Sequence, residues 1–276
     1  MKLNESTLLK GGLLTIFLFF SLIAFAQLKT TDLLPVSPEI KIGKLSNGLT
    51  YYIRKNTKPE KKVELRLVIK AGSILEDDDQ QGLAHFVEHM AFNGSKNFKK
   101  NDLISFLQSI GVEFGADLNA YTSFDETVYI LPIPTDKPEN LEKGFLVLED
   151  WASTVAFENE EIDKERGVVL EESRLGKGAN DRMNKVIFPK LFEGSKYGQR
   201  LPIGKEEILK SFKYDAVKRF YKDWYRPNLM AVVVVGDIDP AEAEKKIKAH
   251  FEKLNAQSIA RSVEIDSSRR LKGNIP

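Results

Sequence analysis

Two of the three histidines in this chain, His85 and His89, lie four residues apart, and Glu88 lies between them. On an α-helix, residues i and i+4 share one face one turn apart, so both imidazoles can bind a single metal ion. The Glu88 carboxylate would project near the same face, within reach of a water held by that ion. Two neutral nitrogen ligands, a nearby general base and an open coordination position are the components of a zinc hydrolase.

The order of this motif, His-x-x-Glu-His, inverts the commoner His-Glu-x-x-His, and the inverted order is typical of its own class of metallopeptidases. The alternative is a helix that carries two unrelated surface or core histidines. The flanking residues favour the metal site. Phe86 and Met90 would hold a helix over residues 82–92 inside a domain, and Asn93-Gly94 would end it.

Composition narrows the class of protein. The chain has 276 residues, of which 42% are hydrophobic, and this is enough for a sizeable core. The formal net charge of +1 gives no support to nucleic-acid binding, which usually shows as a strong basic excess. Because cysteine is absent, a zinc ion must be held by histidine, aspartate or glutamate.

The first 26 residues have the pattern of a secretory signal peptide. A basic start precedes an almost wholly apolar stretch over residues 11–25, and Ala24-Phe25-Ala26 has the small-x-small form of a cleavage site. The alternative is a membrane anchor, for which the apolar run is short against the roughly 20 residues of a span. We therefore expect export to a bacterial periplasm or cell surface, with membrane contact only through the signal peptide.

Strand and helix patterns follow one another in mixed order after a lead-in over residues 27–38. The expected strands are 39–45 and 49–55 (joined by an Asn47-Gly48 turn), 63–69, 119–123, 126–131 and 230–235. Besides 82–92, one helix is expected to be capped by Asn101 or Asp102 and to end at residue 110. The other expected helices are 141–155, 159–175, 183–192 (broken at Pro189), 206–212, 214–224 and 240–254.

Three further expectations concern the end of a strand, a loop and a linker. Pro132 and Pro134 should end the strand before them, residues 76–79 should form a solvated acidic loop, and residues 255–276 should be a linker. The whole pattern predicts an α+β domain over residues 39–254, with a two-layer arrangement of an antiparallel or mixed sheet packed against helices.

A zinc site needs a third protein ligand, and without cysteine a carboxylate is expected. The helix over residues 159–175 offers several. Glu165 and Glu172 are seven residues apart and share a helical face, and Glu161 lies four residues before Glu165. Glu171 points about 100° away from Glu172 around the helix. The alternative is an ordinary solvated acidic face, and spacing alone does not choose among these residues.

Several separate stretches resemble the pitrilysin/insulinase-type (M16) zinc peptidases, which include the mitochondrial processing peptidases and bacterial periplasmic enzymes of the PqqL type. They are residues 82–92, 119–122 with 125–129, 165–172, 225–229 and 232–237. The first resembles the metal helix of the family, the second its substrate-binding edge strand and the third its distal-glutamate helix. The resemblance extends over nearly all of residues 39–254.

The resemblance implies that His85, His89 and Glu172 bind one zinc ion per chain, at the N-terminal catalytic domain of a metalloendopeptidase. Glu165 matches a second family glutamate that supports the site without binding zinc. The separation from His89 to Glu172 is longer than is usual in the family, which leaves Glu171 and Glu165 as alternative third ligands.

The resemblance also implies roles for the remaining site residues. Glu88 would act as general base on the zinc-bound water, and peptide substrates would pair by strand addition with the backbone of the edge strand. The edge-strand residues are Asn119, Ala120, Tyr121 and Thr122.

Family enzymes pair such a domain with a second, similarly folded but degenerate domain. The resemblance therefore implies a second homologous domain or a partner chain that closes the site, so that this chain would be a half-enzyme. The alternative is a non-catalytic structural or assembly subunit, but such subunits usually lose the metal-binding residues, which are all present here.

Overall fold

A computed structural model describes residues 35–112 and 119–255 of the chain. The chain divides into two units, Met1–Pro38 and Glu39–Pro276. Residues 35–38 are the described part of the first unit, and they form no helix or strand. The expected signal peptide, residues 113–118 and the expected linker beyond residue 255 lie outside the described residues. In the described part, no helix is long and apolar enough to cross a membrane.

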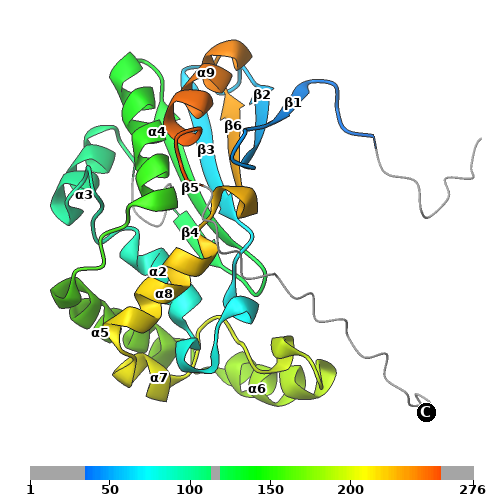
Figure 1. Ribbon diagram of the computed structural model, residues 1–276, viewed down its shortest axis with the longest axis vertical. Helices are drawn as coiled ribbons and strands as arrows, with labels where there is room; N and C mark the ends of the chain where they lie inside the picture. Colours follow the sequence, from blue (N-terminus) through cyan, green and yellow to red (C-terminus); the bar gives the residue numbers. More distant parts are fainter. Residues whose placement is uncertain (1–34, 113–118, 256–276) are drawn as a thin grey trace, which may run out of the picture. The chain divides into compact units, whose positions relative to one another are not determined.

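Six strands of the second unit form one mixed sheet in the order β1-β2-β6-β3-β5-β4 (Figure 1). They are β1 Ile40–Lys44, β2 Thr50–Lys55, β3 Lys62–Ile69, β4 Asn119–Thr122, β5 Thr127–Pro134 and β6 Met230–Gly236. β2 and β6 run parallel, and all other neighbours are antiparallel. The α+β fold with a mixed sheet is therefore confirmed.

The central strands alternate between a buried and a more open face. In β3, Val63, Leu65 and Leu67 are fully buried, whereas Glu64 and Arg66 between them are partly exposed. This alternation is typical of a strand with one face in a hydrophobic core. The valine-rich β6, far downstream in the sequence, lies between β2 and β3 and completes the centre of the sheet.

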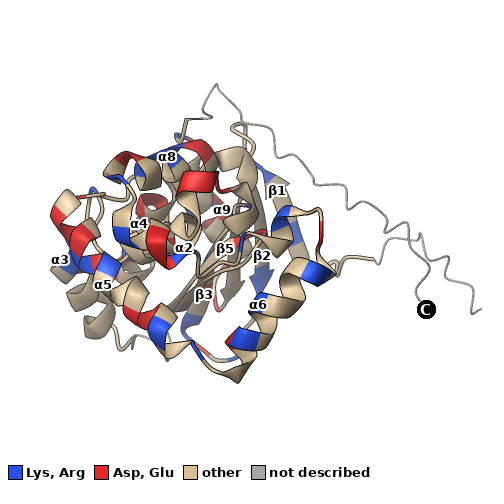
Figure 2. Ribbon diagram, turned by 90° about the horizontal axis from the view of Figure 1, so that it is seen from below, with Lys and Arg blue, Asp and Glu red and all other residues tan. Residues whose placement is uncertain are grey.

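Helices pack on one side of the sheet and beyond its β4 end (Figure 1). They are α2 Leu83–Met90, α3 Lys100–Ser109, α4 Pro138–Ser153, α5 Asn159–Leu175, α6 Ala179–Leu191, α7 Glu206–Ser211, α8 Tyr214–Trp224 and α9 Pro240–Phe251. α4 and α9 contact the sheet, and α2 contacts α5, α8 and β4. Acidic and basic residues are interspersed along the helices (Figure 2).

Two expected boundaries are wrong at the start of α3 and the end of β5. Lys99 is the N-cap residue of α3, so neither Asn101 nor Asp102 caps it. Asp102 lies in the first turn, where a negative charge stabilises the helix dipole. β5 continues through both prolines to Pro134. Beyond Ile130 it has no described partner strand on its outer side, so the absence of a proline N–H on that side breaks no strand pairing.

The expected break at Pro189 is also wrong. α6 begins at Ala179 and continues through Pro189 to Leu191. The proline lies in the last turn, so the hydrogen bond that it lacks and its contact with the preceding turn disturb only the end of the helix. α4 starts three residues before the expected position because Pro138 occupies its first turn, where a proline is well tolerated.

Candidate metal centre

His85 and His89 of α2 and Glu172 of α5 form the group of potential metal ligands that the described residues contain. The two Nε2 atoms are 3.2 Å apart. Glu172 Oε2 lies 3.6 Å from His85 Nε2 and 3.3 Å from His89 Nε2. Ligand atoms about 2.0–2.1 Å from a tetrahedral zinc ion are themselves about 3.3 Å apart. The three atoms therefore form a triangle of the size of one face of a zinc tetrahedron, and the donor set fits this metal.

Apolar packing places α2 where both histidines can meet α5. Phe86 and Met90, about 100° around α2 from the two histidines, are fully buried. The Trp151 indole donates a hydrogen bond to the carbonyl of Ala91 at 2.9 Å. On α5, Val169 is fully buried, so the helix is held by its apolar side. Glu165 and Glu172 then both face α2, as their spacing of two turns predicts.

The ring of His89 is oriented by side-chain hydrogen bonds. Its Nδ1 lies 2.8 Å from Glu165 Oε1, and Asn93 Nδ2 donates to Glu165 Oε2 at 2.8 Å. This arrangement places a proton on Nδ1 and directs Nε2 toward His85 and Glu172. Burial alone would lower the pKa of His89, but the hydrogen bonds to Glu165 and Glu172 outweigh it and raise the pKa to about 9. A cation at Nε2 would therefore displace a proton.

The ring of His85 has a different environment. Burial, with a smaller contribution from the neighbouring His89, lowers the pKa of His85 to about 4, so the imidazole is neutral at physiological pH, as a metal ligand must be. Its Nδ1 is buried and has no hydrogen-bond partner among the described residues. Side-chain hydrogen bonds therefore do not orient this ring as they orient that of His89.

Glu88 is buried beside the two histidines, with 7% of its surface exposed. Thr122 Oγ1 donates a hydrogen bond to Glu88 Oε2 at 2.6 Å. Burial raises the pKa of Glu88 to about 7, although the hydrogen bond from Thr122 and the charge of His89 oppose the shift. A carboxyl group with a pKa near neutrality can both accept a proton and return it.

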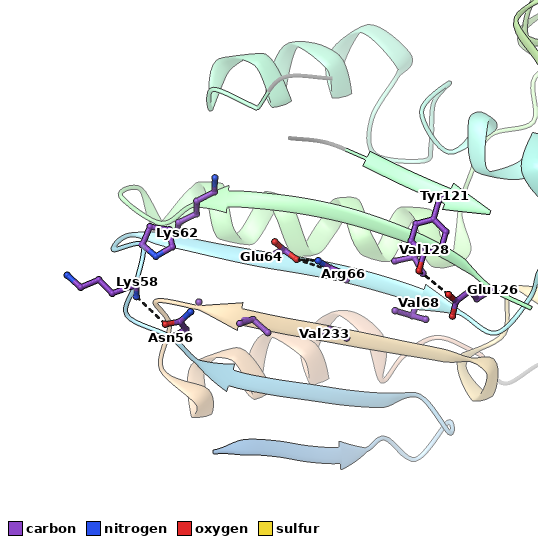
Figure 3. Close-up of a pocket in the computed structure, with 13 residues that line it drawn as sticks. Asn56, Lys58, Lys62, Glu64, Arg66, Val68, Tyr121, Glu126, Val128 and Val233 are labelled. Carbon is purple, nitrogen blue, oxygen red and sulfur yellow. Dashed lines mark hydrogen bonds and ion pairs between the residues drawn. The ribbon is translucent and has the colours of Figure 1, made fainter. Parts of the chain in front are cut away.

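β4 is the edge strand of the sheet among the described strands, and it presents its residues to two different sides. Thr122 contacts Glu88, whereas the preceding Tyr121 points to the opposite face, where its hydroxyl donates to Glu126 at 3.0 Å (Figure 3). Tyr121 lines a hollow of about 660 Å³ on that open face. Ala120 is half-buried against the core, and the backbone of Asn119 pairs with β5. The side chain of Thr122 is the one that contacts Glu88, beside the metal group, among the described side chains of β4.

Two other glutamates of α5, Glu161 and Glu171, have their ion-pair partners outside the metal group. Glu171 is bound by Arg174 on the exposed side of the helix at 2.6 Å. Glu161 pairs with Lys100 at 3.2 Å and with Lys164 at 2.8 Å. Of the carboxylates considered from the sequence, only Glu172 has an oxygen directed at both Nε2 atoms.

The loop before α2 contains a residue whose contribution is not apparent from its sequence. A solvated loop is predicted over residues 76–79, but Glu76 is 1% exposed, so this prediction is wrong at that position. Its Oε1 accepts hydrogen bonds from the backbone N–H groups of Gly82 at 3.0 Å and Ala84 at 2.9 Å. One feature of the sequence could have indicated this role of Glu76. The N-cap residue of α2 is a glycine, which has no side chain to cap the helix, so another residue has to supply the acceptor.

Comparison with protein families decides the class of this chain. Residues 51–201 match the family described as "Insulinase (Peptidase family M16)", and residues 211–274 match "Peptidase M16 inactive domain". The chain belongs to peptidase family M16. In this M16 chain, β6 and α9 fall within the second matched segment but belong to the same sheet and core as the first, so the described parts of the two matches fold together.

Similar proteins include zinc proteases of bacteria and plants. The M16 chain is 44% identical over 240 residues to the "Probable zinc protease PqqL" of Haemophilus influenzae, covering 86% of the chain and 26% of that protein. A "Zinc protease PQQL-like" of Arabidopsis thaliana is 45% identical, with 78% and 23% covered. The chain therefore spans about a quarter of the length of these curated relatives.

Solved structures agree with this fold. The first half of the periplasmic protease PqqL from Escherichia coli has a TM-score of 0.79 at 40% identity, and 84% of this chain covers 49% of that one. Pitrilysin, at 22% identity and a TM-score of 0.70, shares the fold. The M16 chain thus corresponds to about half of the first half of a PqqL structure.

Proposed function

We propose that this chain is the catalytic domain of a zinc-dependent metalloendopeptidase that hydrolyses peptide bonds in extended peptides or unfolded segments. His85, His89 and Glu172 hold one zinc ion per chain, and Glu88 is the general base. The observation that carries this proposal is the triangle formed by the two Nε2 atoms and Glu172 Oε2, at 3.2, 3.3 and 3.6 Å. Similarity to named zinc proteases supports it.

When bound, zinc supplies a water of lowered pKa and polarises the peptide carbonyl. Glu88 accepts the proton of the attacking water and returns it to the leaving amine, a task suited to its pKa of about 7. Thr122 holds the accepting carboxylate through its hydroxyl. Glu165 is a supporting residue that orients His89 through Nδ1 and does not bind the metal.

The outer edge of β4 is the proposed substrate-binding surface. The backbone of Asn119, Ala120, Tyr121 and Thr122 pairs with β5 on one side and has no described partner strand on the other. A peptide added along this edge would run next to Glu88, because Thr122 belongs to both the edge and the hydrogen bond to Glu88. Backbone pairing gives affinity with little sequence preference.

A second homologous domain or partner chain is proposed to close the site. The aligned part of this chain covers only 26% and 23% of two curated relatives, which supports a requirement for further parts. One similar structure is of a periplasmic protease, and with the basic and apolar N-terminal sequence this supports export to the periplasm or cell surface. The alternative of a non-catalytic subunit is not favoured, because the complete ligand set is retained.

The test is zinc content with matched variants. The purified chain should contain one zinc per molecule by elemental analysis, and His89→Ala and Glu172→Gln should lose it. Glu88→Gln should retain zinc but abolish hydrolysis of an unstructured fluorogenic peptide. Glu171→Gln, which changes the neighbouring carboxylate outside the triangle, is the control and should retain zinc.

Each outcome bears on a separate part of the proposal. A folded wild-type chain without zinc would refute the peptidase function and favour a structural subunit. Full zinc content in Glu172→Gln would assign the third ligand to another residue. A chain that binds zinc stoichiometrically but hydrolyses no peptide by itself would show that the catalytic unit requires the additional domain.

A further inference from the structure

We propose that Glu76 is a positioning residue of the metal centre, which holds His85 in place through two backbone hydrogen bonds to the first turn of α2. This inference rests on the proposed function of His85 as a metal ligand. It assigns a role in metal binding to a side chain that does not contact the metal ligands.

The contact is made where the helix lacks a cap of its own. Gly82 is the N-cap residue of α2, has a φ of +100°, and provides no side-chain hydrogen bond. Glu76 Oε1 accepts from the N–H of Gly82 at 3.0 Å and from the N–H of Ala84 at 2.9 Å. These donors flank the first helical residue, and Ala84 directly precedes His85. One carboxylate oxygen therefore fixes the turn that carries the ligand.

The described hydrogen bonds of the Glu76 carboxyl group all go to the backbone at the start of α2. Its second oxygen, Oε2, is buried without a partner among the described residues. A surface cap would leave this oxygen in water, and burying it without a partner costs free energy. The group is therefore held in an unfavourable environment in which its hydrogen bonds go only to α2.

The loop that carries Glu76 is anchored on both sides. Arg200 Nε donates to the backbone carbonyl of Glu76 at 3.3 Å, and Ser73 Oγ donates to the carbonyl of Arg200 at 2.6 Å. Gln80 is fully buried, and its Nε2 donates to the carbonyl of Ala216 in α8 at 2.8 Å. Glu76 thus connects α2 to a fixed frame and not to a free loop.

His85 needs such support more than His89 does. His89 has Glu165 on its Nδ1 at 2.8 Å, whereas Nδ1 of His85 has no described partner. The position of the His85 ring therefore depends on the backbone turn and on packing. A displaced first turn would move one ligand relative to the other two, and this distinguishes positioning from a general contribution to stability.

The experiment measures zinc affinity in the full chain by competition with a chromophoric chelator. The variants are Glu76→Ala, Glu76→Asp and Glu76→Gln. The matched control is Asp239→Ala, because Asp239 caps α9, which carries none of the proposed ligands, by accepting from two backbone N–H groups at 2.8 and 3.2 Å. Thermal unfolding of each variant is measured in parallel, so that affinities are compared only between folded proteins.

We expect Glu76→Ala to bind zinc about tenfold more weakly, at the lower end of the range for residues behind metal ligands. Glu76→Asp, with a shorter side chain, should fall between Glu76→Ala and wild type, and it keeps the test valid if the alanine variant does not fold. Glu76→Gln retains an acceptor oxygen and should stay within about threefold of wild type. Asp239→Ala should leave zinc affinity unchanged while lowering stability by about 1 kcal/mol.

Unchanged zinc affinity in both Glu76→Ala and Glu76→Asp would overturn the inference and leave the proposed function intact. A loss of affinity in Asp239→Ala as large as in Glu76→Ala would also overturn it, since the effect would then follow stability alone. A wild-type chain without zinc would refute the proposed function instead. The two failures are therefore distinguishable.

Discussion

The two ends of α2 hold their histidines by different means. At the C-terminal end, the ring of His89 is hydrogen-bonded to Glu165, which Asn93 supports in turn. At the N-terminal end, Glu76 binds the backbone beside His85, and the ring itself has no described hydrogen-bond partner on Nδ1. One ligand is thus oriented through its side chain and the other through its backbone, although both lie on one helix of eight residues.

This difference has consequences for pH and for metal binding. Burial would lower the pKa of both rings, but the hydrogen bonds to Glu165 and Glu172 raise the pKa of His89, whereas burial keeps that of His85 low. A carboxyl group that binds the backbone, as Glu76 does, fixes the position of the turn without contacting the ring. Substitutions at the two ends should therefore differ in what they disturb.

The largest expected effect is the pH dependence of stability at the N-terminal end. Burial raises the pKa of Glu76 from 4.5 to about 8, although backbone hydrogen bonds oppose the shift. Between these two pH values the folded state retains a proton that the unfolded state releases. The contribution of Glu76 to the free energy of unfolding therefore falls as pH rises from 4.5 to about 8. Compared with wild type, Glu76→Gln should gain a few kcal/mol of relative stability between pH 4.5 and about 8.

Denaturant unfolding of both proteins across this pH range measures that difference. Slopes from other groups, including Glu88, are common to both and cancel. A wild-type and a Glu76→Gln curve that run parallel from pH 4.5 to 8 would contradict the raised pKa. The control is Glu171→Gln, which alters an exposed carboxylate with a lowered pKa and should show no gain over this window.

At the C-terminal end, Glu165→Ala should weaken zinc binding about 10- to 100-fold, equivalent to about 1.4–2.7 kcal/mol. The ring of His89 would lose the hydrogen bond that fixes its tautomer and orientation. Chelator competition measures the affinity. Glu161→Ala is the control on the same helix, because its carboxylate pairs with Lys100 and Lys164 instead. Equal affinities of Glu165→Ala and wild type would show that the orientation of His89 does not depend on this carboxylate.

Gly204→Ala would disturb the backbone at the N-terminal end of α2, because the added methyl group would overlap Gly82. A Cβ at Gly204 would lie 2.3 Å from the Cα of Gly82, and the backbone has a φ of +76°. We expect a loss of about 2 kcal/mol in unfolding free energy, from the left-handed backbone and from the overlap. Gly194→Ala is the matched control, with a φ of +81° and no neighbour within 4 Å.

Thermal or denaturant unfolding separates the two contributions. Gly194→Ala should lose only the part due to backbone conformation, about 1 kcal/mol. If the two variants are equally stable, the contact between Gly82 and Gly204 does not constrain the start of α2.

How far the sequence predicts this site depends on how local each contact is. The facing of His85 and His89, and that of Glu165 and Glu172, follows from helical spacing within one element. The contact from Thr122 to Glu88 joins residues 34 positions apart, and no periodicity relates them. Glu76 appears as one acidic residue in a run of four, and only the fold distinguishes it from its neighbours.

The same distinction applies to the fold. The strands and helices themselves follow from period and punctuation, and α5 and α8 have the predicted bounds. The place of β6 between β2 and β3 depends on pairing across more than 160 residues of chain, which a strand pattern does not encode. β5 continues to Pro134 because it has no described partner strand on its outer side there, and α6 continues through Pro189 because the proline lies in its last turn, where little of the helix remains to be disturbed.

The smallest expected effect is at Asn93, whose side chain reaches the ring of His89 only indirectly, through its hydrogen bond to Glu165. Its Nδ2 donates to Glu165 Oε2 at 2.8 Å and to the His89 carbonyl at 3.1 Å. Asn93→Ala should weaken zinc binding about threefold and lower stability by about 1 kcal/mol, because Glu165 keeps its own bond to the ring. Asn97→Ala, which removes a similar bond to Asp150 at 2.7 Å away from the metal group, should leave zinc affinity unchanged. A loss in Asn93→Ala larger than in Glu165→Ala would mean that the amide, and not the carboxylate, orients the His89 end of α2.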